Sequence, residues 1–367
     1  MNLTKRNVSI DIIKGIGIFL MVSGHGGAPY THFIYLFHMA IFFIASGYLF
    51  NSKHSQNLEA TFTFIKRKFH SLWLPYIGWM SIFSILHNFF IKINIYTDNP
   101  RLLDYLSGKF IKITPYWSLT DVLKNISKGI LLHGGSQVGS AMWFLATLME
   151  INILYCLINF CLKRKLNQNN LLIAQGIIAV FFLLIGYILS LKRELWFGYA
   201  RVFSFYILFY LGHIIKIFNF SNYWKTHKAQ TAVLIICFLI LLSMNKIGSI
   251  DLGNNSYVNP LYLLIVSCVG WQFLYEIAEL IKGINPLRKF WVIVGRNTLS
   301  VVILHFLSFK IINLLEVIIM RKPDFLIAAF PTLYTNNGWW IGYVIVGLTI
   351  PILLNIMRKD IIKNYRR

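Results

Sequence analysis

Charged side chains are scarce in this chain: Asp, Glu, Lys and Arg together make up only 13% of its 367 residues. Soluble globular domains carry roughly a quarter of their residues as charges, so this composition excludes a soluble protein. Hydrophobic residues reach 57%, and the mean hydropathy is +0.62. The composition therefore indicates a polytopic membrane protein.

Acidic residues and cysteines are also few. Against 35 basic residues stand 13 acidic ones, which gives a net charge of +22. Because the basic residues gather between apolar stretches, we interpret the charge as a topology signal and expect no nucleic-acid partner. The four cysteines lie in or at the edges of apolar stretches, which argues against a disulfide framework or a zinc site.

Ten apolar stretches are long enough to cross a bilayer. They cover residues 8–24, 31–50, 71–95, 141–162, 170–190, 199–219, 229–245, 258–280, 297–319 and 339–357. If the N-terminus is cytoplasmic, basic residues favour the inner segments by roughly two to one, as the positive-inside rule requires. We therefore predict an all-α, multi-pass protein of the cytoplasmic membrane with about ten transmembrane helices and both termini cytoplasmic. A single domain spans residues 1–367, and no separate soluble domain is expected.

Four ionisable residues lie in the run of residues 10–50 that the first two apolar stretches occupy: Asp11, Lys14, His25 and His38. An ionisable group at the centre of a membrane helix costs roughly 2.5 to 3.5 kcal/mol, so it is rarely present without a pairing, transport or catalytic task. Asp11 and Lys14 are three residues apart and can face each other on a helix. Lys14 and His25 fall on one stripe, about 16 Å apart along the axis. One face of the first helix is predicted to be a polar track.

A signature of polar, small and aromatic residues runs through the first fifty positions and continues in weaker matches downstream. Its members are, in order, Asp11, Lys14, Gly15, Gly24, His25, Phe37, His38, Met39, Phe42, Phe43, Ser46, Gly47, Tyr48, Leu49 and Phe50, then Arg67, Leu74, Pro75, Tyr76, Met142, Trp143, Phe144, Leu145, Phe209, Tyr210, Leu211, Gly212, Gly295, Arg296, Asn297, Thr298, Leu299, Ser300 and His305. This order resembles the acyltransferase 3 family of integral-membrane O-acyltransferases, and within it the fucose 4-O-acetylase-like group.

The resemblance implies a ten-helix core that takes an acyl group, usually acetyl, from acyl-CoA on the cytoplasmic side. The acceptor would be a sugar hydroxyl of a cell-surface polysaccharide or its lipid-linked precursor, on or beyond the outer side. Acetyl-CoA, the glycan acceptor and the lipid bilayer are the expected partners. No metal is expected, and the oligomeric state stays open.

Catalysis is assigned to His25, Lys14 and Asp11. Acylation of an alcohol needs a group that takes the hydroxyl proton, and imidazole suits this at neutral pH. His25 is therefore expected to act as the base, or alternatively as a covalent acyl carrier. The plainer interpretations are that His25 ends a helix at the interface and that Lys14 neutralises Asp11.

Donor binding is assigned to Lys66, Arg67 and His70, at the inner start of the third apolar stretch. The basic run Lys66, Arg67 and Lys68 there can bind the phosphates of coenzyme A, or can simply anchor the topology. Arg67 matches the first arginine of the family's Arg-x-x-Arg element, and His70 replaces the second.

Acceptor binding is assigned to His38, Arg201 and Trp143. A packed histidine and an interfacial arginine are the plain alternatives, and the role of His305 is left open. A long outer loop, about residues 96–140, places Tyr116 and Trp117 at the headgroup level or over the site as a lid. The alternative function is a glycan or lipid transporter, or flippase, that uses the intramembrane charges as a substrate or proton path.

Overall fold

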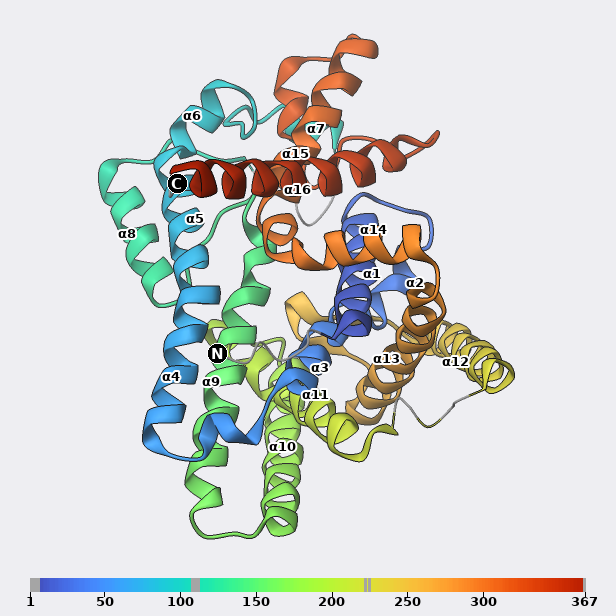
Figure 1. Ribbon diagram of the computed structural model, residues 1–367. Helices are drawn as coiled ribbons and strands as arrows, with labels where there is room; N and C mark the ends of the chain where they lie inside the picture. Colours follow the sequence, from blue (N-terminus) through green and yellow to red (C-terminus); the bar gives the residue numbers. More distant parts are fainter. Residues whose placement is uncertain (1–6, 107–112, 221–222, 224–225, 366–367) are drawn as a thin grey trace. The chain divides into compact units, whose positions relative to one another are not determined.

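The computed structural model describes residues 7–106, 113–220, 223 and 226–365 (Figure 1). Within these residues the fold is helical, apart from one antiparallel pair of two-residue strands, β1 (Ile250–Asp251) and β2 (Ser256–Tyr257). The all-α prediction is confirmed. Contacts divide the chain into two compact units that interleave along the sequence. The assignment of one domain to residues 1–367 stays a prediction.

The first unit takes residues 1–17, 32–75 and 143–295. Its main elements are the first half of α1 (Val8–His25), most of α2 (Thr31–Tyr35), α3 (Ala40–Leu49), η1 (Ser52–Ser55), α4 (Leu58–Lys68), the π turn η2 (Phe69–Trp73), α9 (Trp143–Lys163), α10 (Gln168–Leu191), η4 (Trp196–Gly198), α11 (Tyr199–Phe218), α12 (His227–Ile247), η6 (Leu252–Asn254), α13 (Pro260–Lys282) and α14 (Asn285–Arg296). Helix α11 is central, because it packs against α3, α9 and α10.

Glycines set the closest helix contacts of this unit. A Cβ on Gly47 of α3 would run into the carbonyl oxygen of Phe209 on α11, and a Cβ on Gly212 of α11 would run into that of Ile44. The start of α1 meets α14 in the same way, through Gly15 and Gly295. Small residues let membrane helices approach backbone to backbone, which explains why glycine occupies these positions.

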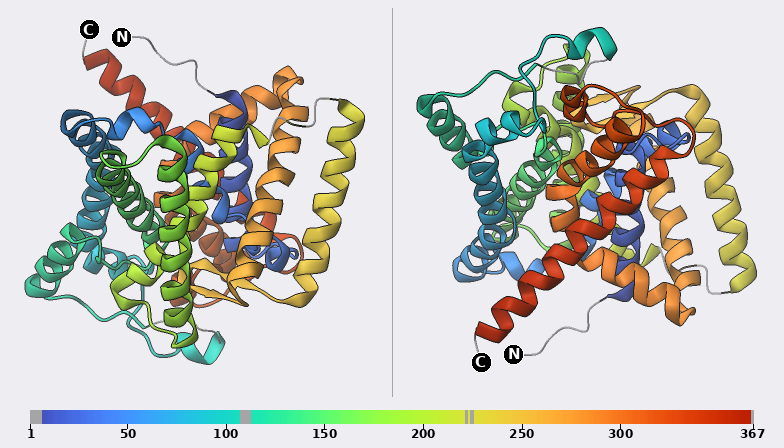
Figure 2. Two further views of the ribbon diagram at one scale, coloured as in Figure 1. Left: turned by 90° about the horizontal axis from the view of Figure 1, so that it is seen from below. Right: turned by 90° about the horizontal axis from the view of Figure 1, so that it is seen from above.

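The second unit takes residues 18–31, 76–142 and 296–367. Its elements are the second half of α1, nearly all of α5 (Leu74–Ile85), α6 (His87–Lys92), α7 (Leu102–Tyr105), α8 (Leu119–Ile130), η3 (Ser140–Met142), α15 (Thr298–Ile319), η7 (Asp324–Ala328) and α16 (Trp339–Tyr365). Helices α15 and α16 pack side by side and form the core of this unit (Figure 2).

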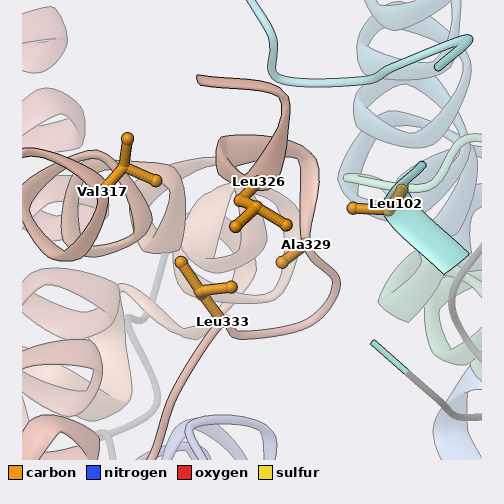
Figure 3. Close-up of a cluster of buried hydrophobic side chains, with 5 residues drawn as sticks. All are labelled: Leu102, Val317, Leu326, Ala329 and Leu333. Carbon is orange, nitrogen blue, oxygen red and sulfur yellow. The ribbon is translucent and has the colours of Figure 1, made fainter. Parts of the chain in front are cut away.

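The connection between α15 and α16 folds back onto α15. Figure 3 shows the apolar side chains that fix it: Leu326, Ala329 and Leu333 from the connection, Val317 from α15 and Leu102 from α7. The start of the long loop is therefore packed into this unit. Trp117, further along that loop, stacks on His87 at 3.7 Å between ring centres, while Tyr116 is exposed. Residues 107–112 of the loop lie outside the described part.

Nine helical segments within the described residues are long and apolar enough to cross a membrane, not ten. The missing one is the predicted stretch 71–95. The helix enters it through a π turn just before Pro75, whose missing N–H cannot complete the regular hydrogen-bond pattern. It then breaks at Leu86, between α5 and α6. Cytoplasmic placement of both termini requires an even number of crossings and stays a prediction.

Candidate active site

Helix α1 ends at His25, which meets His305 of α15 within the second unit. The Nδ1 of His25 lies 2.9 Å from the Nε2 of His305, a hydrogen-bond distance. The helix stops there because Gly27 adopts a φ of +77°, a conformation that glycine reaches without strain. Thus the interpretation of His25 as a helix-end residue is right about the backbone, but the side chain is also engaged in a specific contact.

Aromatic and backbone groups hold this histidine pair in place. Phe306 stacks on His25 with ring centres 4.8 Å apart, and the Nδ1 of His305 lies 2.8 Å from the carbonyl oxygen of Val301. His305 is completely buried, whereas His25 is partly exposed. An imidazole that is held by a hydrogen bond and is only partly buried is suited to proton transfer.

The first unit contains Asp11 and Lys14, on the first half of α1. Asp11 is buried and Lys14 is partly exposed. Lys14 acts electrostatically on Lys68 of α4. The positive charge of Lys14 on α1 therefore lies close enough to Lys68 on α4 to affect its protonation.

Basic side chains gather around His54 in the first unit. A guanidinium nitrogen of Arg67 lies 3.2 Å from the Nδ1 of His54. Burial, helped by the charges of Arg67, Lys68 and Lys216, lowers the pKa of His54 to about 4, so its neutral ring accepts this hydrogen bond. Burial, with Arg67 and Lys14 nearby, also lowers the pKa of Lys68 to about 8. We call Lys14, His54, Arg67, Lys68 and Lys216 the basic cluster.

Lys216 places the basic cluster at the end of α3. It donates to the carbonyl oxygen of Phe50, the residue that caps α3, at 2.7 Å. The end of a helix carries partial negative charge that favours cations. Nearby, Lys163 donates to the carbonyl oxygen of Ser52 at 3.3 Å. The cluster is thus assembled from α1, η1, α4 and α11.

Lys66 and His70 are exposed, as Arg67 also is, but neither belongs to the basic cluster. Lys66 projects from another face of α4 than Lys68, because two residues span about 200° of a helix. His70 lies in the π turn. Their role in donor binding stays a prediction, whereas Arg67 lies in the basic cluster.

Arg201 and Trp143, both predicted to bind the acceptor, lie together in the first unit. The guanidinium of Arg201 lies 4.9 Å from the ring centre of Trp143, and its Nε donates to the carbonyl oxygen of Gly253 at 2.8 Å. Arg201 also acts electrostatically on Glu150 of α9. The segment between β1 and β2 is therefore tied to the start of α11.

His38 lies in the turn between α2 and α3, where the predicted second helix tightens. It is buried, its Nδ1 lies 3.0 Å from the carbonyl oxygen of Ile34, and its ring stacks on Tyr35. Tyr35 in turn feels the charge of Asp251 of β1. Tyr35 therefore lies between His38 and Asp251 of β1 in this chain of interactions. The role of His38 in acceptor binding stays a prediction.

Three residues of these sites were not predicted from the sequence. His305 belongs to the family signature, but the sequence assigned it no role, and neither His54 nor Lys216 was predicted to bind a ligand. Only the signature order pointed to His305, which lies 280 positions after His25. Nothing local distinguishes Lys216 from the other basic residues at helix ends.

Residues 7–356 match the family described as the acyltransferase domain. The chain belongs to the acyltransferase 3 family. Curated proteins and solved structures gave no match. This acyltransferase shows, within its described residues, no group of three His, Cys, Asp or Glu side chains that could hold a metal ion.

Proposed function

We propose that the protein is an O-acetyltransferase that moves an acetyl group from cytoplasmic acetyl-CoA to a hydroxyl of a cell-surface polysaccharide or its lipid-linked precursor. The observation that carries this proposal is the contact between His25 and His305 in a chain of an acyltransferase family. The bacterial cytoplasmic membrane as the location and the fucose 4-O-acetylase-like group belong to the same proposal.

His25 supplies the proton transfer in this reaction. The acceptor hydroxyl loses its proton to His25 while its oxygen attacks the thioester carbonyl carbon. The carbon–sulfur bond then breaks, and His25 returns the proton to the departing thiolate. The products are an O-acetyl ester and coenzyme A. In the covalent alternative, a nitrogen of His25 carries the acetyl group between donor and acceptor.

The basic cluster is the proposed site for the donor. Coenzyme A carries phosphates, and the planar guanidinium of Arg67 can bind a phosphate through two hydrogen bonds. Lys68 and Lys14 add positive charge close to Arg67. Lys66 and His70 are proposed as outer contributors, because both are exposed on the same helical segment. Asp11 is proposed to support Lys14 from one turn earlier on α1.

The Trp143 and Arg201 pair is the proposed site for the acceptor. An aromatic face beside a few fixed polar groups is a common arrangement in sites for polar organic ligands. The carboxyl of Glu150 and the segment after β1 add hydrogen-bonding groups next to Arg201. His38 is proposed to contribute from the turn before α3.

The test is the O-acetyl content of the surface polysaccharide, measured by proton NMR. A deletion strain is complemented with the wild type, with His25→Ala, or with His227→Ala, which changes an exposed histidine at the start of α12, at matched membrane levels. We expect His25→Ala to leave the polymer in place without its O-acetyl signal, and His227→Ala to behave as the wild type.

Two other outcomes would contradict the proposal. Loss of the polymer itself in the deletion strain would favour the alternative function, a transporter or flippase. A transport defect stops export of the whole polymer, whereas an acetyltransferase defect removes only its acetyl groups. Unchanged acetylation with His25→Ala would remove His25 from the chemistry.

A further inference from the structure

The hydrogen bonds of His305 determine where its proton lies. A backbone carbonyl oxygen only accepts hydrogen bonds, so the Nδ1 of His305, 2.8 Å from the carbonyl oxygen of Val301, carries a hydrogen. In a neutral imidazole the other nitrogen then has none. The Nε2 of His305, 2.9 Å from the Nδ1 of His25, is therefore an acceptor.

The proton position on His25 follows directly. Since the Nε2 of His305 accepts, the Nδ1 of His25 must donate, and the hydrogen of a neutral His25 is on Nδ1. Its Nε2 is then the nitrogen that has a lone pair for a proton or an acetyl group. One backbone carbonyl, acting through His305, thus selects the tautomer of His25.

The geometry of the two rings fits this hydrogen bond. Their centres lie 5.1 Å apart and their planes are inclined by only 15°. Because a ring nitrogen lies about one bond length from the ring centre, a nitrogen separation of 2.9 Å then places both nitrogens close to the line that joins the centres. The rings thus meet edge to edge, which is the favourable direction for an imidazole N–H.

Burial keeps His305 in its neutral form. The ring is completely buried, with Phe306 and Phe309 packed against it. A charged imidazolium would be costly to place there. A positive His305 would also have a hydrogen on Nε2, which cannot accept from His25. The arrangement therefore depends on a neutral ring at position 305.

We propose that His305 is a positioning residue that fixes His25 as the Nδ1–H tautomer and directs its Nε2 toward the reacting groups. This inference rests on the proposed function. In the reaction, Nε2 takes the hydroxyl proton as the acceptor oxygen bonds to the thioester carbon. The same nitrogen returns the proton to the coenzyme A thiolate when the carbon–sulfur bond breaks. In the covalent alternative, Nε2 is the nitrogen that bonds to the acetyl carbon.

A neutral partner suits both halves of this proton cycle. A carboxylate at position 305 would stabilise a positive His25 by its charge and so hold the proton. A neutral imidazole orients His25 without adding a negative charge. The proton taken from the hydroxyl is therefore released more readily to the departing thiolate.

The kinetic test uses the purified full-length protein in lipid nanodiscs. The probes are radiolabelled acetyl-CoA and surface polysaccharide stripped of its esters by mild alkali. We expect His305→Leu to lower kcat at least about tenfold, the lower end of the loss seen when a metal-binding histidine loses its orienting partner, with little change in KM for acetyl-CoA. His305→Gln places an amide oxygen near the former Nε2 and is expected to recover much of the loss.

A matched control separates orientation from general damage. His87→Leu also removes a buried imidazole of the second unit that contacts a backbone carbonyl, that of Pro115. We expect this variant to keep its kcat. Full kcat with His305→Leu, or a loss of kcat that is equal for His305→Leu and His305→Gln, would overturn the inference.

A spectroscopic test needs no variant at position 305. Nitrogen NMR of protein with isotope-labelled histidine distinguishes the two neutral tautomers, and His25→Ala identifies the His25 signals. A hydrogen on Nδ1 of His25 supports the inference, and a hydrogen on Nε2 overturns it. If the wild type transfers no acetyl group at all, the proposed function fails instead, whatever the tautomer.

Discussion

Gly47 of α3 and Gly212 of α11 lie where the backbones of these two helices touch. Each glycine faces the carbonyl oxygen of a residue on the other helix, Phe209 and Ile44 respectively. Both glycines belong to the signature found in sequence. The contact places the end of α3, where Lys216 of α11 reaches the carbonyl of Phe50, in a fixed position beside α11.

The first prediction concerns this contact. Gly47→Ala and Gly212→Ala each push a methyl group against a backbone carbonyl that cannot move aside, so we expect each to destabilise the protein by about 1 to 3 kcal/mol. The measurement is the thermal unfolding midpoint of the purified protein. Gly78→Ala on α5 is the matched control, because a Cβ there meets nothing within 4 Å. Equal midpoints for all three variants would contradict the prediction.

The second prediction concerns the donor. Arg67→Gln removes the guanidinium of the basic cluster, and we expect KM for acetyl-CoA to rise about 10- to 100-fold, as for a lost charged hydrogen bond of about 1.5 to 3 kcal/mol. The value of kcat should change little. Lys165→Gln, in an exposed turn after α9, controls for the loss of one positive charge. A normal KM with Arg67→Gln would place the donor elsewhere.

Lys66→Gln and Lys68→Gln together test which face of α4 binds the donor. Sequence alone predicts a donor contact at Lys66, whereas the structure places Lys68 with Arg67 and Lys14. If KM rises only with Lys68→Gln, the donor binds on the face of α4 that carries Lys68. If it rises with Lys66→Gln as well, the exposed face takes part.

The third prediction concerns pH. Burial lowers the pKa of Lys68 to about 8, so the ammonium group loses its charge as the pH rises through that value. We expect KM for acetyl-CoA to be flat below about pH 8 and to rise above it, because a neutral amine no longer attracts phosphate. Lys68→Arg stays charged and should flatten the profile. A wild-type KM that does not change across pH 8 would contradict this.

The same shift has the opposite effect on stability. Between about pH 8 and the ordinary pKa of lysine, Lys68 holds its proton more fully in the unfolded chain than in the folded one, so its contribution to stability rises with pH in that window. Lys68→Met should remove this contribution. The pH profile of KM for acetyl-CoA reports on donor binding, and the pH profile of stability reports on folding, so comparing the two profiles separates these effects.

Local patterns predicted most of the fold but not the pairing of its functional residues. Long apolar stretches are local features, and nine of the ten expected ones correspond to suitable helices in the described part of the chain. The stretch 71–95 failed because hydropathy does not register the π turn before Pro75 or the break at Leu86. The contact of His25 with His305 depends on how α1 meets α15, which no local spacing encodes.

The basic cluster shows the same limit on a smaller scale. Lys66, Arg67 and Lys68 are consecutive, and nothing in the sequence favours Lys66 over Lys68 as the neighbour of Arg67 in a donor site. Helix geometry selects Lys68, because it follows Phe64 by one turn on the face of α4 that is packed against the unit. Charge alone could not distinguish the two lysines, since the difference depends on which face of α4 is buried.

The last prediction concerns the acceptor. Arg201→Gln removes the cation that stacks on Trp143 and weakens the tie to Gly253, so the segment between β1 and β2 loses its anchor. We expect KM for the de-esterified polysaccharide to rise about tenfold or more, as a lost charged hydrogen bond would require, while KM for acetyl-CoA stays unchanged. Trp143→Leu should act in the same direction. Trp196→Leu is the matched control, because this tryptophan lies close before Arg201 and is 54% exposed. If Arg201→Gln instead raised KM for acetyl-CoA alone, Arg201 would belong to the donor site, and its assignment to the acceptor site would be wrong.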